Sequence, residues 1–156
     1  LKLLIVGDGF QLEPLKQEAA ELGIADRVHF AGRQEDVTGF LNMMDVFVLP
    51  ALVDEGVPQA MSQAMASGLP VITTPSGAIT ELIRDGETGL FTPRGDAEAL
   101  AAAIKRVIED EALAKRLGTV ARAHIEAGYT RKKMLDDMEH VLKLAIERRS
   151  FKAARA

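Results

Sequence analysis

The sequence predicts an α/β fold, in which a doubly wound parallel sheet of about five strands is followed by additional helices at the C-terminus. Two observations support this fold class. Short apolar runs alternate with segments whose apolar residues recur every three or four positions, the spacing of one helix face. Glycine or proline stands at most of the junctions between them. Parallel strands need such helical crossovers, and these are almost always right-handed.

The predicted strands are short, and most of their residues are apolar. Leu1–Val6 contains one polar residue, Lys2, which is typical of a strand covered on both faces. No internal repeat or linker interrupts the chain, and its 156 residues suffice for one core. We therefore expect residues 1–156 to form a single Rossmann-like domain. The expected strands are residues 1–6, 27–30, 45–49, 71–73 and 90–91.

The predicted helices have recognisable starts. Pro58 suits the first position of a helix, because the N–H that proline lacks would have no helical acceptor there. Ser76 and Asp96 are plausible N-caps, since their side chains can accept a hydrogen bond from a free N–H in the first turn. The expected helices are residues 12–22, 36–44, 58–67, 76–84, 97–108, 111–127 and 130–149.

The composition excludes several classes of function. Apolar residues make up 47% and charged residues 27% of the chain, which is ordinary for a globular protein. A formal net charge of −4 gives no reason to expect nucleic-acid binding. Without cysteine the chain can form neither disulfides nor thiolate metal sites. No apolar run reaches the roughly 18 to 20 residues that span a bilayer. We expect a cytoplasmic protein.

The charge is distributed unevenly along the chain. From residue 131 to the end there are 8 basic and 4 acidic residues, so the net charge of −4 leaves −8 for residues 1–130. A basic helix of this kind is either a solvated face or a surface that docks to an acidic partner or to anionic lipid. The second interpretation would place the protein peripherally at the inner face of the membrane.

Most motifs for catalysis and metal binding do not occur in the sequence. The three histidines lie in separate predicted elements without the spacing of metal ligands, so we expect no metal site. There is no G-x-S-x-G turn and no Walker-type phosphate loop. The turn Gly7-Asp8-Gly9 follows a strand and opens a helix, but the third glycine of a dinucleotide fingerprint would fall at Leu12. We interpret Gly7 and Gly9 as parts of a tight turn or of a loop that faces a ligand.

One stretch, residues 55–68, carries most of the functional signal. It follows the predicted strand at residues 45–49 and precedes the one at residues 71–73. In parallel α/β domains, ligands bind at the turn that leaves the carboxyl end of a strand. Glu55 stands in this turn, where its carboxylate can accept hydrogen bonds from sugar hydroxyls.

The helix that follows Glu55 adds two further features. The N–H groups of Gln59 and Ala60 lie in its first turn, where unpaired N–H groups and the helix dipole favour a phosphate or an electron-rich hydroxyl. Gly56 lets such a ligand approach the main chain. Gln63 lies about 7 to 8 Å further along the helix axis, so it suits a second part of one extended ligand.

Several motifs occur in a fixed order: VGDG at 6–9, VHFAG at 28–32, EGVPQ at 55–59, QAMASGLPVI at 63–72, GAITELI at 77–83 and DGETGLFTP at 85–93. In this order they resemble the C-terminal, nucleotide-sugar-binding domain of retaining GT-B glycosyltransferases of the large group 1 / family 4 type. The resemblance covers about residues 1–128.

The resemblance implies roles for individual residues. Glu55 matches the first acid of an E-x7-E motif, which holds hydroxyls of the donor sugar, and Gln63 takes the place of the second acid, which holds the ribose. An amide can still accept from and donate to a ribose diol. The turn at Gly32 and Arg33 matches the place that receives the base. Main-chain groups that would line the sugar and diphosphate are those of Gly56, Val57, Pro58 and Gln59.

By the same resemblance, the donor is a UDP- or GDP-linked sugar, and no cofactor or metal is required. The Arg and Lys that clamp the diphosphate, the strand before them and the acceptor-binding domain would all precede Leu1. We assign no catalytic residue within the chain. The leading hypothesis is the donor-binding part of an enzyme that transfers a hexose to a hydroxyl acceptor with retention. The alternatives are a non-catalytic nucleotide-sugar-binding module and an interaction module.

Overall fold

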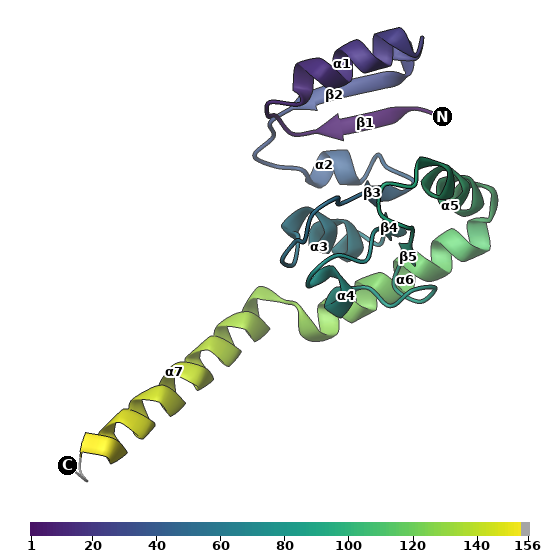
Figure 1. Cartoon of the computed structure of the whole chain (residues 1–156). Helices are drawn as coiled ribbons and strands as arrows, with labels where there is room; N and C mark the ends of the chain where they lie inside the picture. The colour runs from purple at the N-terminus through teal and green to yellow at the C-terminus, as the bar shows by residue number, and fades with distance from the viewer. Residues whose placement is uncertain (154–156) are drawn as a thin grey trace. The chain divides into compact units, whose positions relative to one another are not determined.

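The computed structural model describes the backbone of residues 1–153 and the side chains of residues 1–146 (Figure 1). The chain forms two compact units, Leu1–Met44 and Asp45–Ala156, each with its own sheet. The described residues contain five strands, as predicted, two in the first unit and three in the second. All pairings between these strands are parallel, which confirms the predicted α/β fold class.

The first unit is a two-stranded sheet with helical connections. Its elements are β1 (Leu3–Val6), α1 (Leu12–Glu21), the 3-10 helix η1 (Ala25–Arg27), β2 (Val28–Gly32) and α2 (Thr38–Leu41). The two strands pair from Leu3 with Val28 to Val6 with Gly32. Beyond this last pair, the N–H of Gly7 donates to the carbonyl oxygen of Gly32 at 2.8 Å. The turns that leave the two strands therefore lie side by side.

α2 is a single turn, whereas the apolar spacing predicted a helix over residues 36–44. The Asp36 carboxylate accepts a hydrogen bond from the N–H of Thr38 at 2.9 Å, so Asp36 precedes the helix. At the other end, the N–H groups of Met43 and Met44 donate to carbonyls three residues earlier, which is the tighter 3-10 pattern. The prediction was too long because a stripe of apolar residues is buried equally well by one helical turn with flanking turns.

The second unit has β4 at the centre of a three-stranded sheet. The order is β3 (Phe47–Leu49), β4 (Val71–Thr73) and β5 (Leu90–Phe91). Every residue of β4 is buried, as expected for a strand covered on both faces. Its neighbours pair with it in parallel register, Val48 with Ile72 on one side and Ile72 with Leu90 on the other.

Five helices complete the described part of the second unit, which confirms the predicted additional helices at the C-terminus. They are α3 (Gln59–Ala66), α4 (Ile79–Leu82), α5 (Ala97–Glu109), α6 (Glu111–Gly128) and α7 (Arg131–Ala153). Asp96 caps α5 as predicted, because its carboxylate accepts from the N–H of Ala99 at 2.8 Å. The central core cluster joins the sheet to α5 and α6 through Ile72, Leu90, Val107, Leu113 and Leu117.

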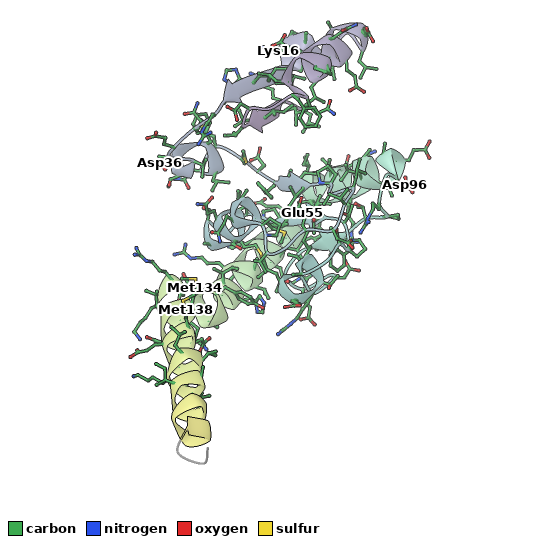
Figure 2. All side chains as sticks on the ribbon, turned by 60° about the vertical axis from the view of Figure 1, so that its left-hand side comes forward. Lys16, Asp36, Glu55, Asp96, Met134 and Met138 are labelled. Carbon is green, nitrogen blue, oxygen red and sulfur yellow. The ribbon has the colours of Figure 1, made fainter. Side chains whose placement is uncertain are left out.

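α7 carries exposed apolar side chains along its described length. They are Met134, Leu135, Met138, Val141, Leu142, Leu144 and Ile146, of which Met134 and Met138 are labelled in Figure 2. Ion pairs between residues four apart stabilise its polar side and join Lys132 to Asp136, Lys133 to Asp137 and Lys143 to Glu139. Within residues 1–153, no helix has both the length and the apolar character needed to cross a membrane.

α3 and α6 approach each other closely at two glycines. A Cβ atom added to Gly118 in α6 would lie 2.0 Å from the carbonyl oxygen of Gly68, just after α3. Such a distance is far shorter than a van der Waals contact, and the obstacle is main chain, which cannot rotate away. α3 is also held by its buried side chains Met61 and Met65. The burial of these side chains and the contact with α6 together fix the position of the helix that carries Gln63.

We predict that Gly118→Ala destabilises the protein by about 1 to 3 kcal/mol, the usual cost of overpacking a core. The matched control is Gly128→Ala in the same helix, where an added Cβ would meet nothing within 4 Å. There alanine should be neutral or stabilise by up to about 1 kcal/mol through helix propensity. Urea unfolding measures both variants, and equal stability of the two would contradict the proposed close contact.

Candidate functional site

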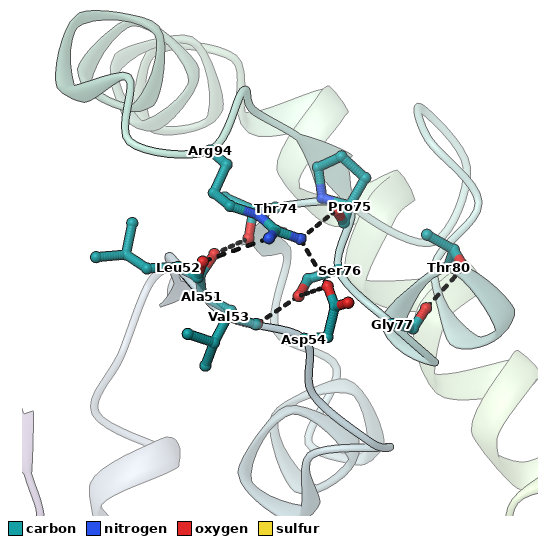
Figure 3. Close-up of polar contacts among 10 residues, drawn as sticks. All are labelled: Ala51, Leu52, Val53, Asp54, Thr74, Pro75, Ser76, Gly77, Thr80 and Arg94. Carbon is teal, nitrogen blue, oxygen red and sulfur yellow. Dashed lines mark hydrogen bonds and ion pairs between the residues drawn. The ribbon is translucent and has the colours of Figure 1, made fainter.

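A ladder of hydrogen bonds holds the loop between β3 and α3. Its donors lie at the end of β4 and just beyond, and its acceptors are the main-chain oxygens of every second residue on the facing segment. The bonds are Thr73 Oγ1 to Leu49 O at 2.8 Å, Thr74 Oγ1 to Ala51 O at 2.7 Å, Ser76 Oγ to Val53 O at 2.5 Å and Ala78 N to Glu55 O at 3.0 Å. Figure 3 shows the bonds from Thr74 and Ser76. The loop is thereby fixed as far as Glu55.

The three hydroxyl groups of this ladder belong to buried residues. Thr73, Thr74 and Ser76 expose at most 1% of their surface. A buried polar group without a partner costs about 1 to 3 kcal/mol, so the loop carbonyls and these hydroxyls need one another. Side-chain hydroxyls thus extend the hydrogen bonding of the sheet beyond the last paired residues of β3 and β4.

Gly77 brings the two sides of the ladder into direct contact. It has a φ of +50°, a conformation that favours glycine, and an added Cβ would lie 2.2 Å from the carbonyl oxygen of Glu55. No residue with a side chain fits at this position without moving the loop. The main chain of Glu55 therefore packs directly on the turn after β4.

α3 begins one residue later than predicted. Pro58 has an extended conformation with φ −67° and ψ 123° and is the N-cap, not the first helical residue. Its carbonyl accepts the first helical bond, from the N–H of Ser62 at 3.1 Å. The N–H groups of Gln59, Ala60 and Met61 have no acceptor among the described residues. They give the loop side of α3 a cluster of unpaired donors.

Glu55 and Gln63 both present exposed side chains next to these donors along the chain. Neither side chain forms a hydrogen bond or an ion pair with another residue in the described part of the protein. Glu55 is fixed through its main chain, and Gln63 is fixed by the packing of α3. The structure thus joins Glu55, Gly56, Val57, Pro58, Gln59 and Gln63 in one loop-and-helix segment of the second unit. Glu55 is labelled in Figure 2.

The remaining predicted site residues lie in the first unit. Gly7 and Gly9 have φ angles of +138° and +148°, and Gly32 has +65°, so each adopts a conformation that glycine favours. The bond from Gly7 to Gly32 places their two turns together at the carboxyl ends of β1 and β2. Arg33 follows directly, and its side chain is exposed.

The sequence analysis assigned the wrong role to Ser76. Its hydroxyl was expected to cap a helix over residues 76–84, but it donates to the facing loop instead. The main-chain oxygen of Ser76 accepts from the N–H of Ile79 at 3.0 Å, and α4 is limited to one turn. The hydroxyl is buried beside a carbonyl oxygen, and this tertiary partner takes precedence over a local cap.

The ion pair between Arg94 and Asp54 was not anticipated. Arg94 follows β5, and its Nη2 donates to Asp54 Oδ1 at 2.9 Å (Figure 3). The hydrogen bond and the positive charge of Arg94 hold the pKa of Asp54 below its usual value. One sequence signal could have indicated the pair, since Arg94 comes just after a strand whose carboxyl end faces the same edge of the sheet as the Asp54 loop.

The histidines show no arrangement for catalysis or metal binding. Among the described side chains, no group of three or more His, Asp or Glu residues could hold a metal ion. His124 in α6 packs against Tyr129 with ring centroids 5.1 Å apart. Burial, with a smaller contribution from Arg84, lowers the pKa of His124, so the neutral ring is favoured and serves packing.

This combination of fold and loop matches known proteins. The profile of the family described as glycosyl transferases group 1 matches residues 1–124. The lipopolysaccharide core biosynthesis glycosyltransferase LpsE of Rhizobium meliloti is 35% identical over 134 residues, which are 86% of this chain and 39% of LpsE. The chain therefore belongs to the glycosyl transferase group 1 family, as the resemblance predicted.

Solved structures share the fold of this chain. HepE of Anabaena, crystallised in complex with UDP-glucose, superposes with a TM-score of 0.87 at 25% identity over 91% of this chain and 40% of HepE. The C-terminal domain of the group 1 protein LpcC from Francisella tularensis superposes with a TM-score of 0.74 at 22% identity, over 83% of this chain and 70% of that domain. The chain spans about two fifths of the length of LpsE and HepE.

We predict that Thr74→Val destabilises the protein by about 1 to 3 kcal/mol, because it leaves the Ala51 carbonyl without its buried partner. The matched control is Thr80→Val, which removes a hydroxyl bond of 2.9 Å to Gly77 on the exposed surface, where water can replace it (Figure 3). That variant should change stability by less than about 0.5 kcal/mol. Thermal or urea unfolding compares the two, and equal losses would contradict the role of burial in the ladder.

Proposed function

We propose that this chain binds the nucleotide-diphosphate sugar donor of a glycosyltransferase that moves a hexose to a hydroxyl acceptor with retention of configuration. The observation that carries the proposal is the fixed loop between β3 and α3. It presents an exposed, unpaired Glu55 carboxylate next to the unpaired N–H groups of α3. Membership of the group 1 family and the complex of HepE with UDP-glucose support it.

In this proposal the loop and the start of α3 bind different parts of the donor. The Glu55 carboxylate accepts hydrogen bonds from hydroxyls of the sugar. The main chain from Gly56 to Gln59 lines the sugar and the diphosphate. The free N–H groups and the positive end of the helix dipole favour the negative charge that grows on the leaving diphosphate. This electrostatic contribution needs neither a cofactor nor a metal ion.

The nucleoside part of the donor is assigned to two further places. Gln63 holds the ribose, since its amide can accept from one hydroxyl and donate to the other. The turn at Gly32 and Arg33 receives the base of a UDP- or GDP-linked sugar. Gly7 and Gly9 keep the neighbouring turn free of side chains, so that a ligand can approach its main chain.

In the proposed enzyme, other parts of the full-length protein also take part in the reaction. We propose an N-terminal acceptor-binding domain, together with an Arg and a Lys that clamp the diphosphate.

A non-catalytic nucleotide-sugar-binding module is the second candidate, and the observation in its favour is Gln63, an amide in place of the family's acid. Donor binding without turnover in the full-length protein would favour this second candidate.

We predict that Glu55→Ala in the full-length protein weakens the binding of UDP-glucose or GDP-mannose, whichever binds, by about 10- to 100-fold. This is the usual loss when hydrogen bonds to a charged group are removed. Binding of the free nucleotide UDP or GDP should change little, because Glu55 is assigned to the sugar. Glu87→Ala is the control, since Glu87 is also an exposed carboxylate in a turn. Unchanged sugar-nucleotide binding in Glu55→Ala would refute the role of Glu55.

We further propose a cytoplasmic protein that contacts anionic lipid through residues 131–156. The supporting observations are the exposed apolar side chains of α7 and the excess of basic residues in this segment. The full-length protein should sediment with phosphatidylglycerol vesicles and lose this association when residues 131–156 are removed. Equal sedimentation of the two proteins would exclude the contact.

A further inference from the structure

We propose that Arg94 is a positioning residue for the donor sugar, acting through Asp54 and the loop that carries Glu55. This inference rests on the proposed function of Glu55. Arg94 follows β5 and lies about forty positions after Asp54 in the sequence. It nevertheless contacts both segments joined by the ladder, the loop at Leu52 and the turn after β4 at Pro75. We expect it to set where the Glu55 carboxylate stands before any ligand arrives.

The guanidinium of Arg94 bridges the loop and the turn after β4. Nη2 donates to Asp54 Oδ1 at 2.9 Å and to the carbonyl oxygen of Pro75 at 3.4 Å, and Nη1 donates to the carbonyl oxygen of Leu52 at 3.4 Å (Figure 3). Asp54 also accepts from Ser76 Oγ at 3.4 Å. Arg94 therefore reaches Leu52 and Asp54, the two residues between Ala51 and Glu55 whose carbonyl oxygens take no part in the ladder.

Together the ladder and Arg94 hold every residue from Ala51 to Glu55. The ladder holds the carbonyls of Ala51, Val53 and Glu55, and Arg94 holds Leu52 and Asp54. Asp54 and Glu55 are neighbours in the chain and are joined by one peptide unit. Holding Asp54 in place therefore restricts where Glu55 can lie. A loop ordered in advance loses less entropy when a ligand binds, which raises affinity.

The exposure of the pair distinguishes positioning from stability. The Arg94 side chain is 39% exposed and that of Asp54 is 76% exposed. Ion pairs in such surroundings add little to the stability of a protein. Loss of the pair should consequently leave unfolding almost unchanged, while it releases the loop beside Glu55.

A direct contact between Arg94 and the donor diphosphate makes a different prediction. In that case Arg94 would act on UDP and UDP-glucose alike, and Asp54 would matter less than Arg94. If Arg94 acts through Asp54 on Glu55, the loss should fall mainly on the sugar nucleotide. Removal of either partner should then weaken this binding, and removal of both should cost no more than removal of Arg94 alone.

The test compares Arg94→Met, Asp54→Ala and the double variant in the full-length protein. Isothermal titration calorimetry measures the affinity for UDP and for UDP-glucose, or for GDP and GDP-mannose if the protein binds guanine nucleotides. We expect each single variant to weaken sugar-nucleotide binding about tenfold, well within the loss of about 100-fold that a misplaced group can cause. We expect less than a twofold change for the nucleotide alone, and a double variant no worse than the singles.

Two variants serve as references. Arg122→Met removes an exposed ion pair of similar length, 2.8 Å to Glu126 on α6, and should leave both affinities unchanged. Arg94→Lys retains the charge but not the fork of donors, so it should recover part of the binding. Equal losses for UDP and UDP-glucose, additive losses in the double variant, or wild-type binding by Arg94→Met would each overturn the inference.

Hydrogen exchange of the ligand-free protein separates this inference from the proposed function. The amide of Ala78, which donates to the carbonyl oxygen of Glu55, should exchange faster in Arg94→Met than in the wild-type protein, while Arg122→Met should not differ from it. If the wild-type protein binds neither UDP-glucose nor GDP-mannose, the proposed function is wrong. The anchoring of the loop is then judged by exchange alone, and unchanged exchange in Arg94→Met overturns it.

Discussion

The pairing of buried hydroxyls with main-chain carbonyls is the interaction on which the rest of the second unit depends. Thr73, Thr74 and Ser76 lie where water cannot reach them, so their hydroxyls hold the facing segment at fixed intervals. A strand of only three residues, β3, is thereby continued by a loop with a defined path. The loop then delivers Glu55 to the start of α3. Packing of α3 on α6 fixes the other side of the same segment.

Much of this arrangement could be predicted from the sequence, because its causes are local. Apolar runs gave the strands, the spacing of apolar residues gave the long helices, and Asp96 was identified as a cap from residue type and position. The motif from Glu55 to Gly68 predicted the loop-and-helix segment. The expectation that residues 1–156 act as one donor-binding domain stays a prediction, as do the roles of the individual site residues.

The features that sequence patterns did not predict depend on contacts between distant residues. Ser76 has the composition of a cap, but a carbonyl 23 positions away takes its hydroxyl. Arg94 and Asp54 are 40 positions apart, and only the parallel order of β3, β4 and β5 brings them together. α2 and α4 were predicted too long, since apolar spacing shows which side chains are buried and not how far the helical hydrogen bonds extend.

The way in which the loop is held has a consequence for how the family can vary. Most of the hydrogen bonds that hold the loop are accepted by main-chain carbonyl oxygens, which every amino acid possesses. The side chains of Leu52, Val53 and Val57 remain exposed. The path of the loop and the side chains that it exposes can therefore change independently of each other. Mutation can alter the exposed surface of the loop while the path of the chain is conserved. If the loop binds the donor as proposed, these three positions are where protein engineering can seek altered sugar selectivity without rebuilding the scaffold.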